Sequence, residues 1–546
     1  MFNFKEGTLS LNFSSKNVFL EKISRFINKY QLLLLSLILF IVAITTFTVF
    51  YFNHLGLAYN DARSHLDIGR RVVEGLKPGI AQLGSVWLPL PHILMTLTIW
   101  NDFMWHTGLS GALVSMISFV STGLLIYLFL KELGVGILGR LAGVAIFAAN
   151  LNILYLQSTA MTELLLIATM MAGVYELLKW FKYDNILSLI KAAFWIMLST
   201  LVRYDGWFLF LFAIALIGAR VFLKKGYKAS EGTVILFCTL GGLGIALWFL
   251  WNLLIFHDPL YFIYGPYAAA TQQQQLAAAG VLPTKGNILF SIQVYLYALL
   301  YNSNTFIAIL GALGAIIFWL DKKISTPVKI AAIALLAPLI FNIVALYMGQ
   351  SVLYIQGLSG NTWFNVRYGI MMMSSIAIFT GYLIHKSGKM KIVLIGLLAF
   401  VLFFSFANVD AVTIDDARVG SSQKNVTEVS GWLHNNAASK PGFVLISAAS
   451  HDAIIFSSGL PMSKFIHEGT GLYWISATTA PDRWARWIIM RTNDVNDATF
   501  KLVSKTQAYK NGDYSLVGHY PFADIYELKP QFLSGLNTKP TLGKQK

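Results

Sequence analysis

The sequence carries little charge and almost no cysteine. Only 12% of its 546 residues are charged, and 26 Asp and Glu stand against 41 Lys and Arg. Soluble domains carry about twice this share of charged residues, so a soluble fold is excluded. The single cysteine, Cys238, excludes an intramolecular disulfide.

Long apolar runs are what the sequence has in place of charge. We predict about eleven membrane-spanning helices, each near the length that a bilayer requires. They cover residues 31–52, 108–130, 135–154, 160–179, 185–202, 206–223, 233–255, 304–320, 327–348, 368–385 and 391–408. The first run is too long for a signal-peptide core and is expected to remain as an anchor. The predicted fold class is an all-α polytopic membrane bundle with a small C-terminal α/β domain.

The positive charge follows the predicted topology. The formal net charge is +15, but the lysines cluster in short loops between the spans, and every second loop is basic. This pattern places the N-terminus in the cytoplasm and the C-terminal domain outside it, in a multi-pass protein of the cell membrane. It also argues against a nucleic-acid partner, because no basic patch of the usual kind is present.

The predicted domain organisation has four parts. Residues 1–30 form a cytoplasmic segment, and residues 31–408 form the transmembrane module with a long first outer loop at 53–107. Residues 409–530 form the extracytoplasmic α/β domain, and residues 531–546 form a flexible tail. In the α/β domain, strands are predicted at 443–446, 487–490 and 525–528, with helices near 425–435 and 494–505.

An acidic motif, Asn60-Asp61-Ala62-Arg63-Ser64-His65-Leu66-Asp67, follows the first span directly. Its apolar residues recur at helical spacing, which predicts an amphipathic surface helix that ends at Lys77-Pro78-Gly79. Asp61 and His65 share one face of this helix. The tryptophan-rich stretch 86–105 predicts a second, interfacial helix in the same loop, and 288–302 is interpreted in the same way.

Several polar residues are predicted at the same outer membrane face. They are Asp61, His65 and Arg70 in the first outer loop, Glu163 before span four, Arg203 and Asp205 between spans five and six, and Arg367 and Tyr368 before span ten. Carboxylates can deprotonate an acceptor hydroxyl, and arginines can hold an anionic phosphate. The combination suits group transfer from a phosphate leaving group.

Each of these residues also has a structural interpretation. Asp61 could cap the surface helix, and Glu163 could interact with the dipole of its own helix. Arg203 and Arg367 could be interfacial anchors, and Arg70 could contact lipid headgroups. Asp67 is expected to be structural, paired with Arg63 and Arg71. The convergence of the charged residues on one face favours function.

These features resemble the polytopic GT-C glycosyltransferases, in particular the family 39-like branch of protein O-mannosyltransferases and the bacterial aminoarabinose transferase. The resemblance rests on Asn60-Asp61-Ala62-Arg63 after span one, the two surface helices, Thr162-Glu163 and the outer C-terminal domain. Two departures are that Asp61 has no adjacent acid and that no Trp-Trp-Asp signature of oligosaccharyltransferases is present.

The resemblance implies an inverting transfer of a sugar from a polyprenyl-phosphate carrier to an acceptor hydroxyl of a lipid, glycan or protein. It assigns Asp61 as the general base and Glu163 as a second catalytic acid that helps to position acceptor or donor. By their location, Arg203 and Arg367 are candidates for the carrier phosphate. The other candidate substrate-binding residues on this face are His65, Arg70, Asp205 and Tyr368. The expected partners are the lipid-linked sugar donor, the acceptor and membrane lipids.

Metal dependence and two rival functions stay open. The sequence contains no His/Cys cluster, so no metal ligand is assigned and no cofactor is certain. A divalent Mg or Mn ion at Asp61 and Glu163 remains an alternative. The first rival is a transporter or flippase of a lipid-linked or anionic substrate, and the second is a non-catalytic membrane scaffold. Charge near the bilayer midplane would favour a transporter, and the predicted spans contain almost none.

Overall fold

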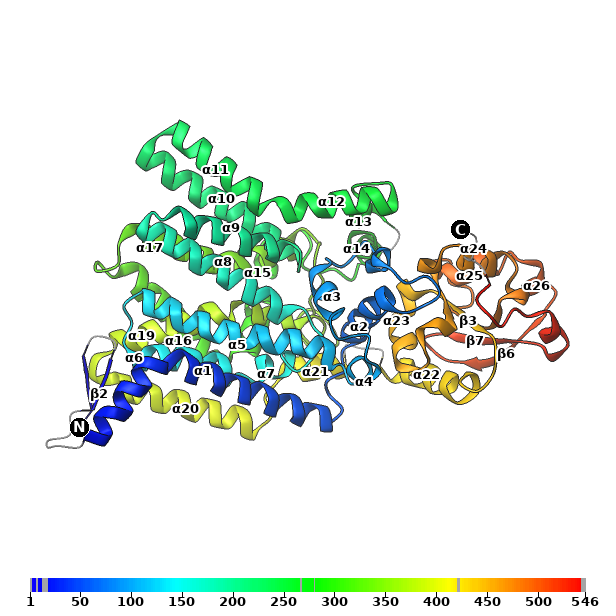
Figure 1. The fold of residues 1–546 in the computed structure, drawn as a ribbon, viewed down its shortest axis with the longest axis horizontal. Helices are drawn as coiled ribbons and strands as arrows, with labels where there is room; N and C mark the ends of the chain where they lie inside the picture. The colour runs from blue at the N-terminus through cyan, green and yellow to red at the C-terminus, as the bar shows by residue number, and fades with distance from the viewer. Residues whose placement is uncertain are drawn as a thin grey trace. The chain divides into compact units, whose positions relative to one another are not determined.

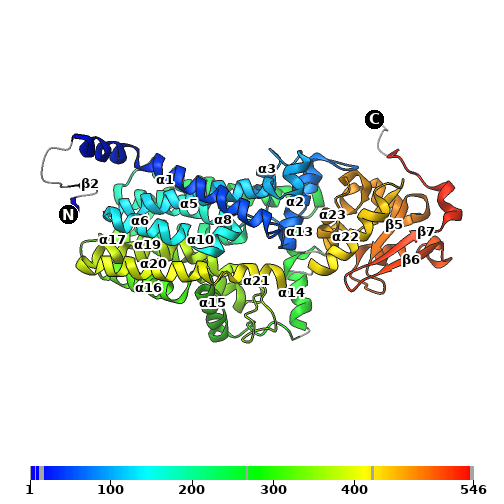
Figure 2. The same cartoon turned by 90° about the horizontal axis from the view of Figure 1, so that it is seen from below.

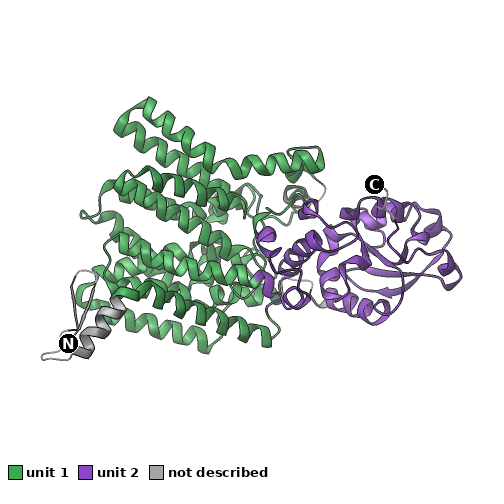
Figure 3. Ribbon diagram, in the orientation of Figure 1, with its two compact units in different colours: residues 1–55, 85–90, 112–420 green, residues 56–84, 91–111, 421–546 purple. Residues whose placement is uncertain are grey.

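The computed structural model describes residues 2–5, 8–11, 18–265, 268–278, 280–419 and 423–541. The chain divides into two compact units, which Figure 3 shows in different colours. The first unit comprises Met1–Leu55, Ser85–Leu90 and Ala112–Gly420, and the second comprises Gly56–Gly84, Pro91–Gly111 and Ser421–Lys546. Two segments of the predicted first outer loop therefore belong to the same unit as the C-terminal region.

The first unit is a bundle of helices (Figure 1). Its N-terminal half contains β1 (Phe2–Lys5), β2 (Thr8–Leu11), α1 (Val18–Phe52), α5 (Leu109–Glu132), α6 (Ile137–Ala148), α7 (Leu151–Leu156), α8 (Glu163–Tyr183), α9 (Ile186–Thr200), α10 (Tyr204–Lys225), α11 (Tyr227–Gly241) and α12 (Leu243–Phe256). Its C-terminal half contains α13 (Tyr261–Tyr264), α14 (Ala269–Ala278), α15 (Ile288–Ser303), α16 (Thr305–Leu320), α17 (Thr326–Ala332), η2 (Ile333–Leu336), α18 (Ala337–Tyr347), η3 (Val366–Met372), α19 (Met373–Lys386), η4 (Gly388–Met390), α20 (Lys391–Ala407) and α21 (Val412–Val419).

Small residues let the bundle helices approach closely. Helix α19 packs against both α6 and α16 (Figure 2). A Cβ atom on Gly139 would lie 2.5 Å from the carbonyl oxygen of Gly381, and one on Gly314 would lie 2.0 Å from that of Phe379. Larger side chains at these positions would force the helices apart. The use of glycine at contacts is typical of helix packing in membranes, where lipid tails supply no hydrophobic driving force.

The structure is that of a multi-pass membrane protein. Among the described residues, seven helices are long and apolar enough to cross a membrane, or nine if each of two bent pairs forms one span. The pairs are α11 with α12, bent by 47°, and α15 with α16, bent by 108°. The predicted spans 135–154 and 185–202 coincide with the shorter apolar helices α6 and α9. Each predicted span thus has a helical counterpart, whereas its orientation in the membrane stays a prediction.

Asn304 makes the sharper of the two bends. It lies between α15 and α16 with φ of 67°, and its side chain accepts a hydrogen bond from the backbone N–H of Phe306. Asparagine tolerates a positive φ better than most residues and also caps helices well. One residue therefore ends α15 and starts α16. The predicted interfacial stretch 288–302 is α15 itself.

The second unit combines short loop helices with an α/β region. The loop segments contribute α2 (Asn60–Val73), η1 (Ile80–Leu83), α3 (Leu90–Met95) from Pro91 onward and α4 (Asp102–His106). The α/β region contains α22 (Gln423–Ala437), β3 (Phe443–Ile446), α23 (Ala448–Ser457), η5 (Met462–Lys464), β4 (Phe465–Ile466), η6 (Glu468–Thr470), α24 (Leu472–Thr479), η7 (Pro481–Arg483), β5 (Ala485–Met490), α25 (Ala498–Val503), α26 (Gln507–Lys510), β6 (Tyr514–His519), β7 (Asp524–Leu528) and η8 (Pro530–Gly535). The single helix predicted over 86–105 is in fact two short helices, α3 and α4.

The sheet of the second unit has the strand order β4-β3-β5-β7-β6. Strand β3 pairs in parallel with β4 and β5, and β7 pairs antiparallel with β5 and β6. Every residue of β3 is buried, which agrees with a central parallel strand covered on both faces. The predicted α/β fold is confirmed, and all three predicted strands are found.

Candidate functional site

The candidate residues fall into two groups, one in each unit. Glu163, Arg203, Asp205, Arg367 and Tyr368 belong to the first unit, and Asp61, His65 and Arg70 belong to the second. Each group is described separately.

Glu163 is the centre of the first group. It is the first residue of α8 and is fully buried. Its Oε1 accepts hydrogen bonds from Nη1 of Arg203 at 3.2 Å and from Nε of Arg367 at 3.1 Å. Its Oε2 accepts no hydrogen bond from the described residues. One buried carboxylate therefore holds two guanidinium groups that are separated by 164 positions in the sequence.

Two further carboxylates flank the arginines. Nε of Arg203 lies 3.5 Å from Oδ2 of Asp205, and Nη1 of Arg367 lies 3.8 Å from Oδ2 of Asp416. The sequence prediction missed Asp416 because its segment had been assigned to the extracytoplasmic domain. The available signal was the acidic pair Asp415-Asp416, a short distance after the last apolar run.

The ring of Tyr368 lies beside both arginines. Its centroid is 5.0 Å from the guanidinium carbon of Arg203 and 5.4 Å from that of Arg367. Such cation–π contacts orient a guanidinium without neutralising its charge. The side chain of Arg203 keeps 22% of its surface exposed, against 6% for Arg367. Arg203 is thus the more accessible of the two cations to a bound anion.

Backbone contacts fix the segment that carries Arg367 and Tyr368. Asn365 precedes η3 with φ of 54°, in the left-handed region. Nδ2 of Asn302 donates to the carbonyl oxygen of Val366 at 2.7 Å, and the hydroxyl of Tyr295 donates to that of Tyr368 at 3.3 Å. Both donors lie on α15, so α15 sets the position of η3.

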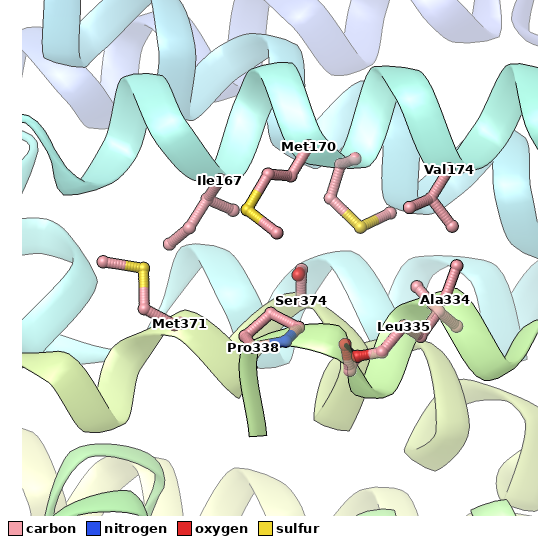
Figure 4. Close-up of a pocket in the computed structure, with 10 residues that line it drawn as sticks. Ile167, Met170, Val174, Ala334, Leu335, Pro338, Met371 and Ser374 are labelled. Carbon is pink, nitrogen blue, oxygen red and sulfur yellow. Dashed lines mark hydrogen bonds between the residues drawn. The ribbon is translucent and has the colours of Figure 1, made fainter. Parts of the chain in front are cut away.

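An apolar cavity lies along the helices that carry Glu163 and Arg367 (Figure 4). Its volume is about 20 Å³, room for about one water molecule. Ile167 lies one helical turn beyond Glu163 on α8, and Met371 lies one turn beyond Arg367 on η3. The lining residues are Ile167, Met170, Met171, Val174, Ala334, Leu335, Pro338, Met371, Ser374 and Ser375. Three methionines make this surface adaptable to an irregular apolar group.

Helix α2 carries the second group. Asp61 lies in its first turn and is partly exposed, while Tyr59 occupies the N-cap position. The interpretation of Asp61 as a helix cap is therefore wrong. The apolar stripe is buried at Ala62, Leu66 and Gly69, as the helical spacing predicts. The helix ends at Val73, before the predicted Lys77-Pro78-Gly79 stop.

His65 pairs with a second histidine from the loop. Its Nδ1 lies 2.8 Å from Nε2 of His92, and both side chains are buried. At this distance one ring nitrogen donates a proton and the other accepts it, so the pair fixes complementary tautomers. Sequence analysis did not identify His92, because 27 positions separate the two histidines.

Arg70 and the other charged residues of α2 mostly contact residues of the same unit. Arg70 forms ion pairs with Glu74 and Asp102 and donates to the carbonyl oxygen of Ile99 at 2.8 Å. Its substrate-binding role stays a prediction. Arg63 donates to the Leu57 carbonyl oxygen and to Ser457. Asp67 lies within electrostatic reach of Arg71, as predicted, while its pairing with Arg63 stays a prediction.

Metal binding gains no structural support. Within the described ranges, no group of three or more His, Cys, Asp and Glu side chains is arranged to hold an ion. Oxygen ligands from only two carboxylates would leave most of a Mg or Mn coordination sphere to water and substrate. The Mg or Mn alternative stays a prediction.

The fold of the chain is similar to that of several solved structures. ArnT from Cupriavidus metallidurans, both bound to undecaprenyl phosphate and in the apo state, is 8% identical with a TM-score of 0.53, over 90% of this chain and 98% of that chain. The Archaeoglobus fulgidus oligosaccharyltransferase tethered with an acceptor peptide is 10% identical with a TM-score of 0.51, over 93% and 75%. No family model and no curated protein sequence matches the chain. At these identities the likeness shows a shared GT-C fold.

Proposed function

We propose that this protein is an integral membrane glycosyltransferase. It would move a sugar from a polyprenyl-phosphate carrier to an acceptor hydroxyl of a lipid, glycan or protein, with inversion, at the extracytoplasmic face. The observation that carries the proposal is the arginine pair held by Glu163 at the ends of apolar helices long enough to cross a membrane. A polyprenyl phosphate has the matching chemistry, an anionic head on an apolar chain.

The two arginines would bind the phosphate of the carrier. Guanidinium groups form charge-assisted hydrogen bonds to phosphate and stabilise the charge that develops as it leaves. Glu163 would act through them, by holding Arg203 and Arg367 in one orientation. The isoprenoid chain of the carrier would lie in the membrane, outside the bundle.

Asp61 would act as the general base. In the transfer, the acceptor oxygen forms a bond to the anomeric carbon while the bond from that carbon to the phosphate oxygen breaks. The acceptor proton passes to the Asp61 carboxylate, and the bonding electrons leave with the polyprenyl phosphate. His65 would orient the sugar through the proton arrangement that its contact with His92 fixes.

The first test is sugar transfer by the purified chain from a panel of synthetic polyprenyl-phosphate sugars. Asp61→Asn keeps the size of the side chain and removes the base, so kcat should fall by about 10²-fold or more, with donor affinity within about twofold of wild type. The matched control is Asp482→Asn, on η7 and outside both groups. Full transfer by Asp61→Asn would remove Asp61 from the mechanism.

A transporter or flippase is the second candidate, favoured by the two bent helix pairs. Broken spans surround the substrate sites of many transporters, and the chain has bends of 47° and 108°. Vesicles with the reconstituted protein would distinguish the two. Movement of a fluorescent polyprenyl phosphate across the bilayer without any sugar transfer would favour the transporter.

A further inference from the structure

The carboxyl ends of the parallel strands form a recognisable edge of the second unit. Ser447 follows β3 and His467 follows β4. In open α/β sheets, ligands bind in the crevice outside this edge. Here a protein carboxylate takes the place of an anion. Glu468 accepts hydrogen bonds from the Ser447 hydroxyl and from the backbone N–H of Ala448, at 2.9 Å for the latter, at the start of α23.

The first outer loop reaches the same edge through Arg71. Its Nη1 lies 2.8 Å from Oδ1 of Asp452, and its Nη2 lies 3.3 Å from Oδ2 of the same carboxylate. This is a two-point guanidinium–carboxylate contact between α2 and α23, and both side chains are about nine-tenths buried. Bidentate geometry fixes direction as well as distance. Arg71 thus ties the end of α2 to the middle of α23.

Three further hydrogen bonds join the loop to the α/β region. Nη1 of Arg63 donates to the Ser457 hydroxyl at 3.0 Å, near the other end of α23. Oε1 of Glu74 accepts from the backbone N–H of Met462 at 3.1 Å, and Nε2 of Gln82 donates to the carbonyl oxygen of Gly469 at 2.7 Å. The contacts span α2 from its first turn to beyond its end, so the helix is held along its length.

We infer that this sheet edge binds α2, the helix of the first outer loop that carries Asp61. Arg71 and Asp452 are then positioning residues for Asp61. The inference rests on the proposed function for the part played by Asp61. Open α/β sheets often bind a small ligand at this edge, whereas here the edge binds other parts of the same chain. Glu468 lies at the start of α23, Arg71 contacts Asp452, and Gln82 contacts Gly469. The role of the C-terminal region in transfer is then mechanical, because it sets the orientation of the helix that carries the base.

The test combines amide hydrogen exchange of α2 with transfer kinetics in the full-length protein. Asp452→Asn keeps the shape, removes the charge and breaks the two-point contact with Arg71. Exchange of the α2 amides should rise by about tenfold or more, because loss of one partner of a buried ion pair is costly. The kcat for transfer should fall by a similar factor, while donor KM stays within about twofold, since the proposed phosphate site lies in the first unit.

The matched control is Glu527→Gln, which breaks the Arg486–Glu527 pair of the same sheet without touching the loop. It should leave exchange of α2 and kcat unchanged. The double variant Arg71→Gln/Asp452→Asn removes both charges and should be no worse than Asp452→Asn alone, because two residues that act as a pair are non-additive. Additive losses would overturn the pairing.

The outcomes separate this inference from the proposed function. Unchanged amide exchange of α2 in Asp452→Asn would overturn the inference that this edge holds α2, whatever the kcat for transfer. Faster exchange with unchanged kcat would overturn the positioning role. Absence of any transfer by the wild-type chain would be a failure of the proposed function, and the exchange data would still decide whether α2 is seated at this edge.

Discussion

Asp67 is a fully buried carboxylate of the second unit. The Trp105 side chain, the Phe456 backbone and the charges of Asp452 and Arg71 all act on it. Burial and then the nearby charge of Asp452 raise its pKa well above the usual value, against the opposing effect of Arg71. Burial likewise raises the pKa of Asp452 to about 6, against the charge of Arg71 and assisted by that of Glu468. The group formed by Asp67, Asp452 and the Arg71 guanidinium has no net charge when one of the two carboxylates is protonated.

The raised pKa values give the second unit a pH-dependent stability. Between the ordinary carboxyl pKa of about 4 and the raised values, the folded state binds more protons than the unfolded state, so stability falls as pH rises. Asp67→Asn mimics the protonated acid and should remove part of this loss. We expect it to raise the melting temperature of the second unit by a few degrees at about pH 8 and to change it little at about pH 5.

Thermal unfolding of the purified chain at the two pH values measures this effect. The control is Asp494→Asn, which changes a partly exposed carboxylate in an i,i+3 pair with Arg491. It should reproduce the wild-type pH profile. A melting temperature for Asp67→Asn that falls equally at both pH values would show that Asp67 is ionised in the folded protein.

At the scale of helices and strands, hydropathy predicted most of the fold. Each apolar run of the sequence corresponds to a helix in the structure, because the length and hydropathy of a bilayer-crossing helix are local properties of the sequence. Contacts between distant segments were not predictable in this way. The pairing of Arg71 with Asp452 joins positions 381 apart, and that of Arg367 with Glu163 joins positions 204 apart. Local spacing favoured Arg71 and Arg63 as partners of Asp67, but it could not reveal that Arg71 also contacts Asp452 and that Arg63 contacts Ser457.

The candidate site shows the same division. Glu163, Arg203 and Arg367 were predicted to share a membrane face, and in the structure they form one cluster. Topology was enough for this, since all three lie at span ends of the same parity. Asp416 and His92 were missed, because nothing in the neighbouring sequence marks their partners. Their positions depend on how α21 and α3 pack.

Helix α15 should control the phosphate-binding segment through Asn302. Asn302→Leu removes the hydrogen bond to Val366 and leaves that carbonyl oxygen buried without its partner. We expect η3 to shift and donor KM to rise by about tenfold, with a smaller change in kcat, because Arg367 would be displaced from its position. Donor titration with the purified variant measures this.

A matched control comes from Asn342, which is also buried but donates within its own helix α18 to Pro338. Asn342→Leu should leave donor KM within about twofold of wild type. Equal effects of the two substitutions would assign the loss to general destabilisation of the bundle.

At the scale of the whole molecule, the division into two units does not follow the order of the chain. The loop segments Gly56–Gly84 and Pro91–Gly111 group with Ser421–Lys546, although the first unit supplies the intervening sequence. The loop therefore depends on a region that follows it by more than 300 positions. Synthesis of the loop precedes synthesis of its partner, so α2 can reach its final contacts only when the chain is nearly complete.

A chain truncated after residue 419 should therefore keep its membrane bundle and lose protection of the loop. Arg63, Arg70 and Arg71 are buried in the full-length protein, and trypsin should cleave at them about tenfold faster, or more, in the truncated chain. Lys224 and Lys225 of the first unit, which are exposed, should be cleaved at the same rate in both proteins. Mass spectrometry of timed digests measures both sets of sites. A loop that stays protected without residues 423–541 would mean that α2 folds on contacts of its own, and the C-terminal region would then need another role.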